Sequence, residues 1–362
     1  MRCLTMVKII AEAGVNHNGS KDLAFKLIDA AHIAGADIVK FQTFKAKNLV
    51  TKDAQQAEYQ KQNSGVNESQ FDMLSRLELD YDTHKSLVAY CSELGIEFLS
   101  TAFDKESLQF LVDDLKLKTL KIPSGDLTNA PFVLEHSSTG CDLIVSTGMA
   151  SLAEVESALA VIAFGLISNN HSEPSEQAFA EAYSSVEGQN ALKQKVTLLH
   201  CTTEYPAPVD EINLNAMTTL ESAFKLTTGY SDHSAGITIP IAATALGAQL
   251  IEKHFTLDKS MQGPDHKASL EPDELTAMVR AIRDVEQALG NGIKGPQPSE
   301  IKNKPIARKS LVAAKAIKAG EVFTESNLTI KRPGNGLSPY KYWSLLGNKS
   351  QQDYAEGDLI NA

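Results

Sequence analysis

The feature that most constrains the fold is a repeat in which eight short β-rich runs alternate with helical patterns, from residue 8 to about residue 290. The runs are 8–14, 37–43, 97–103, 119–125, 142–148, 196–202, 225–233 and 249–255. Segment 21–36 between them has apolar residues at helical spacing, and segment 151–163 starts with a capping-box pattern, Ser151 followed by Glu154. Eight strand–helix units close a parallel barrel, so we expect an α/β chain with a (β/α)8 TIM barrel. A doubly wound open sheet is the alternative.

The ends of the predicted strands are polar, which favours the barrel. They carry Glu12, Lys40 and Gln42, Ser100 and Thr101, Lys121 and Ser124, Ser146 and Thr147, His200 and Thr202, Ser231 to His233, and Glu252 and His254. Ser and Thr also end strands for reasons of turn geometry. A charged side chain inside a buried strand, however, needs a partner, a metal or a ligand. In a barrel these ends meet on one rim, which is where barrel enzymes have their active sites.

The domain organisation changes after the last predicted strand–helix unit. We assign residues 1–290 to the barrel, with a long polar loop at 44–82 as a candidate substrate lid and a surface insertion at 165–195. Segment 291–305 contains three Pro and two Gly and is interpreted as a linker. Residues 306–362 have short strand patterns and turn signals, so we expect a second, small domain there.

Charge and cysteine content exclude several classes of protein. With 34 Lys+Arg against 45 Asp+Glu, the net charge of −11 argues against nucleic acid or an anionic membrane as the main partner. The start of the chain does not read as a signal peptide, and no run reaches the roughly 18–20 apolar residues that span a membrane. The four cysteines are far apart, without a C-x-x-C pair, so neither a disulfide framework nor a zinc ribbon is indicated. We expect a cytoplasmic protein.

Two histidines at neighbouring strand ends suggest a metal site. His233 closes the seventh run and His254 the eighth, and adjacent parallel strands lie about 5 Å apart. Glu12 on the first strand neighbours the eighth across the barrel closure. Two imidazoles and a carboxylate with open positions suit Mn, Fe, Zn or Mg. The alternative is that both histidines are satisfied core residues.

Two lysines inside apolar runs suggest an anionic substrate. Lys40 and Lys121 would be buried cations, which are rare unless they are paired. Hydroxyl groups suited to a phosphate or carboxylate follow neighbouring strands, at Ser124, Ser146, Thr203 and Ser231. A Schiff-base lysine is the competing functional interpretation. In the purely structural interpretation, both lysines extend their ammonium groups from the strand ends into water.

Two further residues lie in turns. Asp265 is either a turn-forming residue or a hydrogen-bonding partner of a polyol substrate. Arg332 precedes a tight Pro-Gly-Asn-Gly loop, which would present its side chain outward.

The motifs that carry these residues resemble the bacterial sialic acid synthase family. They are AEAGVNHNGS (11–20), VKFQTFKA (39–46), LSTAFD (99–104), KIPSGD (121–126), STGM (146–149), LHCTTEYPAP (199–208), GYSDHS (229–234), EKHFTLDKSMQGPDH (252–266) and KRPGNG (331–336). The resemblance covers about residues 8–350. It implies a TIM barrel followed by an antifreeze-like (SAF) domain at 306–362, in a domain-swapped homodimer.

The resemblance also implies a reaction and a role for each residue. Phosphoenolpyruvate and N-acetylmannosamine would condense with water, with a divalent metal (Mn²⁺, or Mg²⁺ or Co²⁺) on His233 and His254. Glu12, Lys40 and Lys121 would be catalytic. Phosphoenolpyruvate would bind to Lys40, Thr101, Lys121, Ser124, Ser146, Thr203 and Ser231, and the sugar to Gln42, Asp126, Tyr205, Asp265 and Arg332 of the other subunit. Asp126 stands where the family commonly has Glu, and Thr203 where some members have Asn.

Other substrates and functions stay open at this point. Relatives that make legionaminic or pseudaminic acid share nearly all these motifs, so 2,4-diacetamido-2,4,6-trideoxymannose is the alternative sugar. A metal-dependent or Schiff-base aldolase or lyase would release pyruvate rather than phosphate. A non-catalytic barrel with an ice- or ligand-binding tail is disfavoured by the combination of histidines and lysines.

Overall fold

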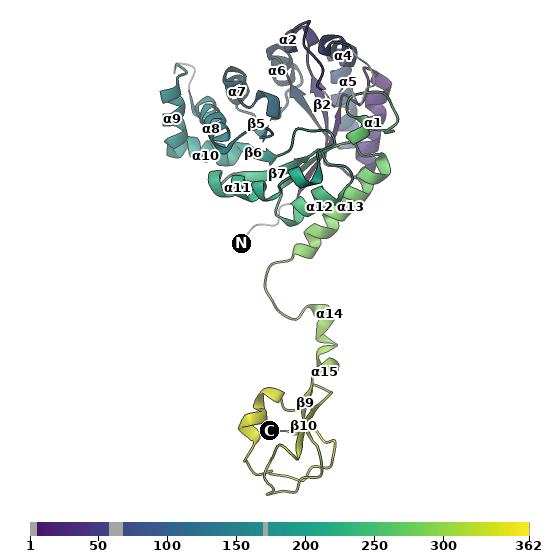
Figure 1. Ribbon diagram of the computed structural model, residues 1–362, viewed down its shortest axis with the longest axis vertical. Helices are drawn as coiled ribbons and strands as arrows, with labels where there is room; N and C mark the ends of the chain where they lie inside the picture. Colours follow the sequence, from purple (N-terminus) through teal and green to yellow (C-terminus); the bar gives the residue numbers. More distant parts are fainter. Residues whose placement is uncertain (1–5, 58–67, 169–172, 362) are drawn as a thin grey trace. The chain divides into compact units, whose positions relative to one another are not determined.

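The computed structural model describes residues 6–57, 68–168 and 173–361. Eight parallel strands form a closed barrel in chain order, with helices around it (Figure 1). They are β1 (Lys8–Gly14), β2 (Ile38–Thr43), β3 (Glu97–Ala102), β4 (Thr119–Ile122), β5 (Asp142–Ser146), β6 (Val196–His200), β7 (Thr227–Asp232) and β8 (Leu250–His254). Strand β1 pairs with both β2 and β8, and Glu12 lies opposite His254. The predicted barrel is confirmed, and the open sheet is excluded because β1 and β8 are joined.

The helices begin and end where local sequence signals place them. In the barrel unit they are α1 (Lys21–Ala34), α2 (Ala46–Leu49), α4 (Gln70–Leu77), α5 (Tyr81–Leu94), α6 (Lys105–Gln109), α7 (Ala130–Ser137), α8 (Leu152–Ile167), α9 (Glu176–Ser184), α10 (Val186–Lys195), α11 (Asn215–Phe224), α12 (Thr238–Ala245) and α13 (Pro272–Leu289), with a π-helical turn at Phe110–Asp114. The Ser20 side chain caps α1, which ends at Gly35 in the left-handed region (φ 80°). The predicted capping box of Ser151 and Glu154 is present at α8.

The predicted polar loop at 44–82 contains helices, and the predicted insertion at 165–195, expected to hold some helix, is largely helical. The first contributes α2, α4 and the first residues of α5, while residues 58–67 lie outside the described ranges. The second holds α9 and α10, which occupy most of residues 176–195. Ser175 and Ser185 cap these helices, so the Ser-rich composition reflects N-caps rather than loops.

The packing has apolar layers outside and inside the barrel. Two large clusters lie between the strands and the surrounding helices. A third, smaller cluster consists of Ile10, Ile38, Leu99, Ile144, Leu199 and Leu250, one residue from each of six strands. In the interior of a parallel barrel such residues form a packed layer, and the barrel is therefore closed by side chains below its rim.

A second compact unit spans Asn291–Ala362. It contains α14 (Pro298–Ile301), α15 (Lys304–Ala307), the antiparallel pair β9 (Ser310–Ala313) and β10 (Leu328–Lys331), and α16 (Tyr342–Leu345). Its own core includes Leu311, Ile317, Phe323 and Tyr354. The segment interpreted as a linker therefore carries two one-turn helices.

Within residues 6–57, 68–168 and 173–361, the helices are all too short or too polar to cross a membrane. Cys91, Cys141 and Cys201 are free and buried. Cys3 lies outside the described residues. The three described thiols agree with the prediction that the cysteines form no disulfide framework.

Candidate active site

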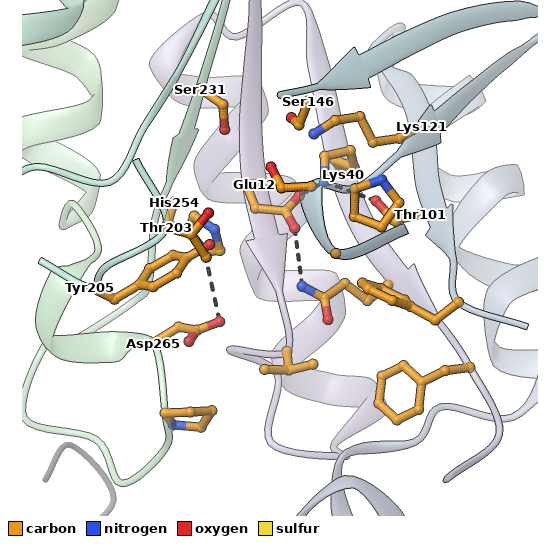
Figure 2. A pocket seen from close by; sticks show the side chains of 18 of the residues that line it. Glu12, Lys40, Thr101, Lys121, Ser146, Thr203, Tyr205, Ser231, His254 and Asp265 are labelled. Carbon is orange, nitrogen blue, oxygen red and sulfur yellow. Dashed lines mark hydrogen bonds and ion pairs between the residues drawn. The ribbon is translucent and has the colours of Figure 1, made fainter. Parts of the chain in front are cut away.

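The candidate site lies directly above the apolar layer inside the barrel. Side chains on a strand alternate between its two faces, so the residue two positions after an inward-facing residue also points inward. Ile10 is followed in this way by Glu12, Ile38 by Lys40, Leu99 by Thr101, Ile144 by Ser146, Leu199 by Cys201 and Leu250 by Glu252. The second residue of each of these six pairs lines one pocket, which has a volume of about 320 Å³. The apolar layer thus lies beneath a polar site. Figure 2 shows side chains that line this site.

Four buried charged side chains form a network at the floor of this site. The Lys40 ammonium lies 2.8 Å from Glu12 Oε2 and 3.5 Å from Glu252 Oε2. Lys121 donates to both carboxylate oxygens of Glu252, at 2.8 and 3.0 Å. Lys40 also donates to Thr101 Oγ1 at 3.1 Å, and the Ser231 hydroxyl donates to Glu252 Oε1 at 2.8 Å. Each of these charged residues is at most 3% exposed, so the predicted burial of the lysines is confirmed.

Burial shifts the ionisation of every group in this network. Burial raises the pKa of Glu12 to about 7, although Lys40 opposes the rise. Burial also acts against ionisation of Glu252, but Lys121 and Lys40 outweigh it and hold the pKa of Glu252 below its usual range. Burial acts against the charge of both lysines: it lowers the pKa of Lys121, whereas Glu12 and Glu252 outweigh it at Lys40 and raise the pKa of that group. Because burial holds Glu12 close to protonation, an anionic ligand can take its place as the partner of Lys40.

Hydroxyl groups line the same space. Ser124 Oγ accepts from the Gly148 backbone N–H at 2.9 Å and contacts Cys201 Sγ at 3.2 Å. Thr203 Oγ1 is buried without a hydrogen-bond partner among the described residues. Ser146 and Ser231 line the pocket as well. An unpaired hydroxyl facing a polar cavity is available to a ligand, because a buried polar group without a partner is costly.

The two predicted metal ligands lie next to each other. The rings of His233 and His254 are 5.5 Å apart between centroids, and His254 is shown with Tyr205 and Asp265 in Figure 2. The His233 Nδ1–H donates to the Thr202 carbonyl at 2.6 Å, which leaves Nε2 with a lone pair 3.2 Å from the Tyr205 hydroxyl. Burial lowers the pKa of His233 to about 4 and that of His254 well below its usual value, so both imidazoles are neutral.

The donor set fits a divalent metal with an open coordination sphere. Neutral imidazoles are good ligands of such ions, and a metal-binding histidine usually donates its other N–H to a carbonyl, as His233 does. His254 Nδ1 is buried without a hydrogen-bond partner in the described chain, and Asp265 Oδ2 lies 3.8 Å from it. Among the described residues, however, no group of three or more His, Cys, Asp or Glu side chains is arranged to hold a metal ion. The Glu12 carboxylate contacts Lys40 instead of completing the predicted two-His-plus-carboxylate set.

Glu252 is the central residue that the sequence-based site omitted. It joins Lys40 and Lys121, which come from β2 and β4, although it lies on β8. The available signal was its spacing, because it precedes His254 by two residues and so shares its face. Asp232 and Lys253 each precede a pocket histidine by one residue, so their side chains lie on the outer face of the strands. There they form a fully buried ion pair of 2.6 Å between β7 and β8.

The predicted sugar-binding residues divide into three groups. Gln42, Tyr205 and Asp265 line the pocket, and Gln42 donates to Glu12 Oε1 at 3.4 Å. Asp126 is half-buried on a 3-10 turn, accepts from Asn129 and is not among the lining residues. Arg332 is an exposed residue of the second unit and donates to the Ala307 carbonyl. Contacts of these residues with a sugar stay predictions.

Comparison with known proteins places this geometry in a family. The sequence matches the NeuB family over residues 27–294 and the SAF domain over residues 308–362. It is 51% identical to N,N'-diacetyllegionaminic acid synthase of Campylobacter jejuni, covering 97% of this chain and 98% of that protein. The enzyme of the same name from Legionella pneumophila is 42% identical, with 97% of this chain and 92% of that protein covered.

A solved structure supports the same assignment. The N-acetylneuraminic acid synthetase of Leptospira borgpetersenii, in complex with citrate, is similar with a TM-score of 0.66 and 32% identity, over 83% of this chain and 90% of that chain. Family, barrel and SAF domain thus agree with the resemblance of the motifs. The chain belongs to the NeuB family.

Proposed function

We propose that the protein condenses phosphoenolpyruvate with 2,4-diacetamido-2,4,6-trideoxymannose and water to N,N'-diacetyllegionaminic acid and phosphate. The observation that carries the proposal is the pair of buried lysines, Lys40 and Lys121, in a pocket that is also lined by hydroxyl groups. The names of the relatives from Campylobacter and Legionella support this sugar. They support N-acetylmannosamine, the sugar first expected, less well.

The reaction is the one that the family resemblance implies, and the pocket supplies groups for each of its steps. Lys40, Lys121 and the hydroxyls of Thr101, Ser124, Ser146, Thr203 and Ser231 would hold the phosphate and carboxylate of phosphoenolpyruvate. Its C3 forms a bond to C1 of the open-chain sugar, whose aldehyde oxygen takes up a proton. Water adds to the resulting oxocarbenium carbon C2 and gives up a proton, and the tetrahedral intermediate expels phosphate by C–O cleavage. Glu12 is the candidate for proton transfer, since a pKa of about 7 lets it hold or release a proton.

A divalent ion on His233 and His254 belongs to this proposal. Mn²⁺ is our first candidate, with Mg²⁺ or Co²⁺ as alternatives, and when bound it would polarise the sugar aldehyde as a Lewis acid. Gln42, Tyr205 and Asp265 would orient the sugar, and Asp126, which follows the lining residue Gly125 in the chain, would join them. Arg332 would come from a second copy of the chain in a domain-swapped homodimer. The three buried free thiols fit the reducing cytoplasm, where we expect the enzyme to act.

The test is phosphate release from phosphoenolpyruvate with Mn²⁺ and each sugar, with and without EDTA. We expect turnover with 2,4-diacetamido-2,4,6-trideoxymannose, loss of turnover in EDTA, and recovery when Mn²⁺ is added back. Turnover with N-acetylmannosamine alone would assign a sialic acid synthase. Release of pyruvate without phosphate would replace the proposal by an aldolase or lyase.

Gly148 provides a further prediction about the phosphoenolpyruvate site. A Cβ at this position would overlap the Thr203 hydroxyl and lie 2.8 Å from Ser124 Oγ. The added methyl would displace the Thr203 and Ser124 hydroxyls, and a hydrogen bond to a charged ligand contributes about 1.5–3 kcal/mol, so Gly148→Ala should raise the KM for phosphoenolpyruvate roughly 10- to 150-fold. Gly125 lines the same pocket, but a Cβ there meets nothing within 4 Å. Gly125→Ala is therefore the matched control, and equal KM values for the two variants would contradict the assignment.

A further inference from the structure

The pocket has an apolar wall in addition to its charged floor. Its members are Phe44, Leu49, Met73, Leu74, Leu77 and Phe103, which come from the segments after β2 and β3 and from helices α2 and α4. They belong to one hydrophobic cluster, distinct from the clusters inside and around the barrel. A cluster whose members all line a ligand pocket is available to bind the ligand as well as to stabilise the fold.

The wall and the floor occupy different depths of the site. Lys40 lies within β2, whereas Phe44 follows the end of that strand. Thr101 and Phe103 have the same relation in β3. A substrate bound at the floor and extending outward past the strand ends meets this wall on one side of the pocket and Tyr205, His254 and Asp265 on another.

The wall offers apolar surface to that outward end. Phe44, Met73 and Leu77 are at most 4% exposed and form the buried part of the wall. Leu49 and Leu74 are half-buried, so part of their side-chain surface is accessible to a ligand. Gln70 at the start of α4 is a polar member of the pocket lining nearby. A hydroxyl pressed against aliphatic side chains gives up hydration without gaining a hydrogen bond, whereas a methyl group gains from leaving water.

We propose that this apolar wall selects a sugar with a methyl group rather than a hydroxymethyl group at C6, and that Leu49 and Leu74 are its specificity-determining residues. The inference rests on the proposed function, because phosphoenolpyruvate and C1 of the sugar must meet over the charged floor. The carbons farthest from C1 then lie against the wall. A 6-deoxy diacetamido sugar is matched to this surface, because it carries a methyl group at C6 where N-acetylmannosamine has a hydroxyl.

The test compares two sugars that differ in one atom, 2,4-diacetamido-2,4,6-trideoxymannose and its 6-hydroxy analogue, in the full chain with Mn²⁺ and phosphoenolpyruvate. Apolar pockets reject an added hydroxyl by up to about a hundredfold, so the wild type should favour the 6-deoxy sugar by roughly 10- to 100-fold in kcat/KM. Leu74→Gln and Leu49→Gln each supply a hydrogen-bonding group and should lower this ratio at least about threefold. The KM for phosphoenolpyruvate, whose site lies at the floor, should stay within about twofold and so report intact folding.

Leu289→Gln is the matched control, because Leu289 is a half-exposed leucine on α13 outside the pocket. It should leave the sugar ratio unchanged. A wild-type ratio near one, or a ratio that neither pocket variant alters, would overturn the inference while the proposed function stands. Phosphate release with neither of these two sugars would overturn the proposed function, and the inference with it.

Discussion

Replacing Lys121 by methionine should lower kcat/KM for phosphoenolpyruvate by at least about a hundredfold, the effect of removing one partner from a buried charged contact. Lys121 is 3% exposed and donates to both oxygens of Glu252. Without it Glu252 keeps its negative charge, opposed by Lys40 at 3.5 Å. The pocket then loses one of its two buried lysine side chains, and the negative charge that remains on Glu252 disfavours an anionic substrate. Steady-state phosphate release measures the effect.

Two variants separate this electrostatic role from a loss of stability. An unpaired buried charge destabilises a protein by about 3–5 kcal/mol, so Lys121→Met should also unfold at lower urea concentration. Adding Glu252→Gln removes the opposite charge and should recover much of that stability without restoring turnover. Lys105→Met is the control at an exposed ion pair, with Glu135 at 2.6 Å, and should change activity less than about twofold. Recovery of turnover in the double variant would refute a requirement for the Lys121 charge.

Replacing His254 by alanine should abolish both tight Mn²⁺ binding and turnover. His254 presents a neutral imidazole beside His233, with Nδ1 unpartnered among the described residues. Loss of an outer-shell partner typically costs 10- to 100-fold in metal affinity, and we expect loss of a direct ligand to exceed about a hundredfold. Titration of Mn²⁺ followed by electron paramagnetic resonance measures the affinity independently of activity.

His200 offers the control for this substitution. It closes strand β6, but its Nε2 lies 2.7 Å from the Ile212 carbonyl and it does not line the pocket. His200→Asn should therefore bind Mn²⁺ like the wild type. If His254→Ala kept wild-type Mn²⁺ affinity, the two histidines would not be the metal site.

Many elements of the fold and several site residues follow from local sequence patterns. Strand β1 has the predicted bounds of 8–14, and α8 starts at its predicted capping box. His233 and His254 were paired from the closeness of adjacent strand ends. Strand β4 is shorter than predicted and ends at Ile122, because Pro123 cannot donate to the strand ladder. These features depend on a few neighbouring residues, so a sequence reports them directly.

The pairing of charges depends on contacts that a linear sequence does not contain. Glu252 and Lys121 are 131 positions apart and come from non-adjacent strands, so only barrel closure brings them together. Glu12 and Lys40 lie opposite each other on the adjacent strands β1 and β2, and their side chains form an ion pair inside the barrel. The apolar wall likewise arises only when α2 and α4 fold over the ends of β2 and β3.

Local patterns are thus enough to predict the strand–helix alternation, the polar rim and the residue types available there, because periodicity and capping act over one or two turns. Which of those groups pair with one another, and which face the pocket, depends on the folded chain. Burial and Coulomb interaction vary with distance in space, and that distance is fixed only by folding. Moving an ammonium group a few ångströms inside a barrel changes its partner, and with it the charge that a substrate meets.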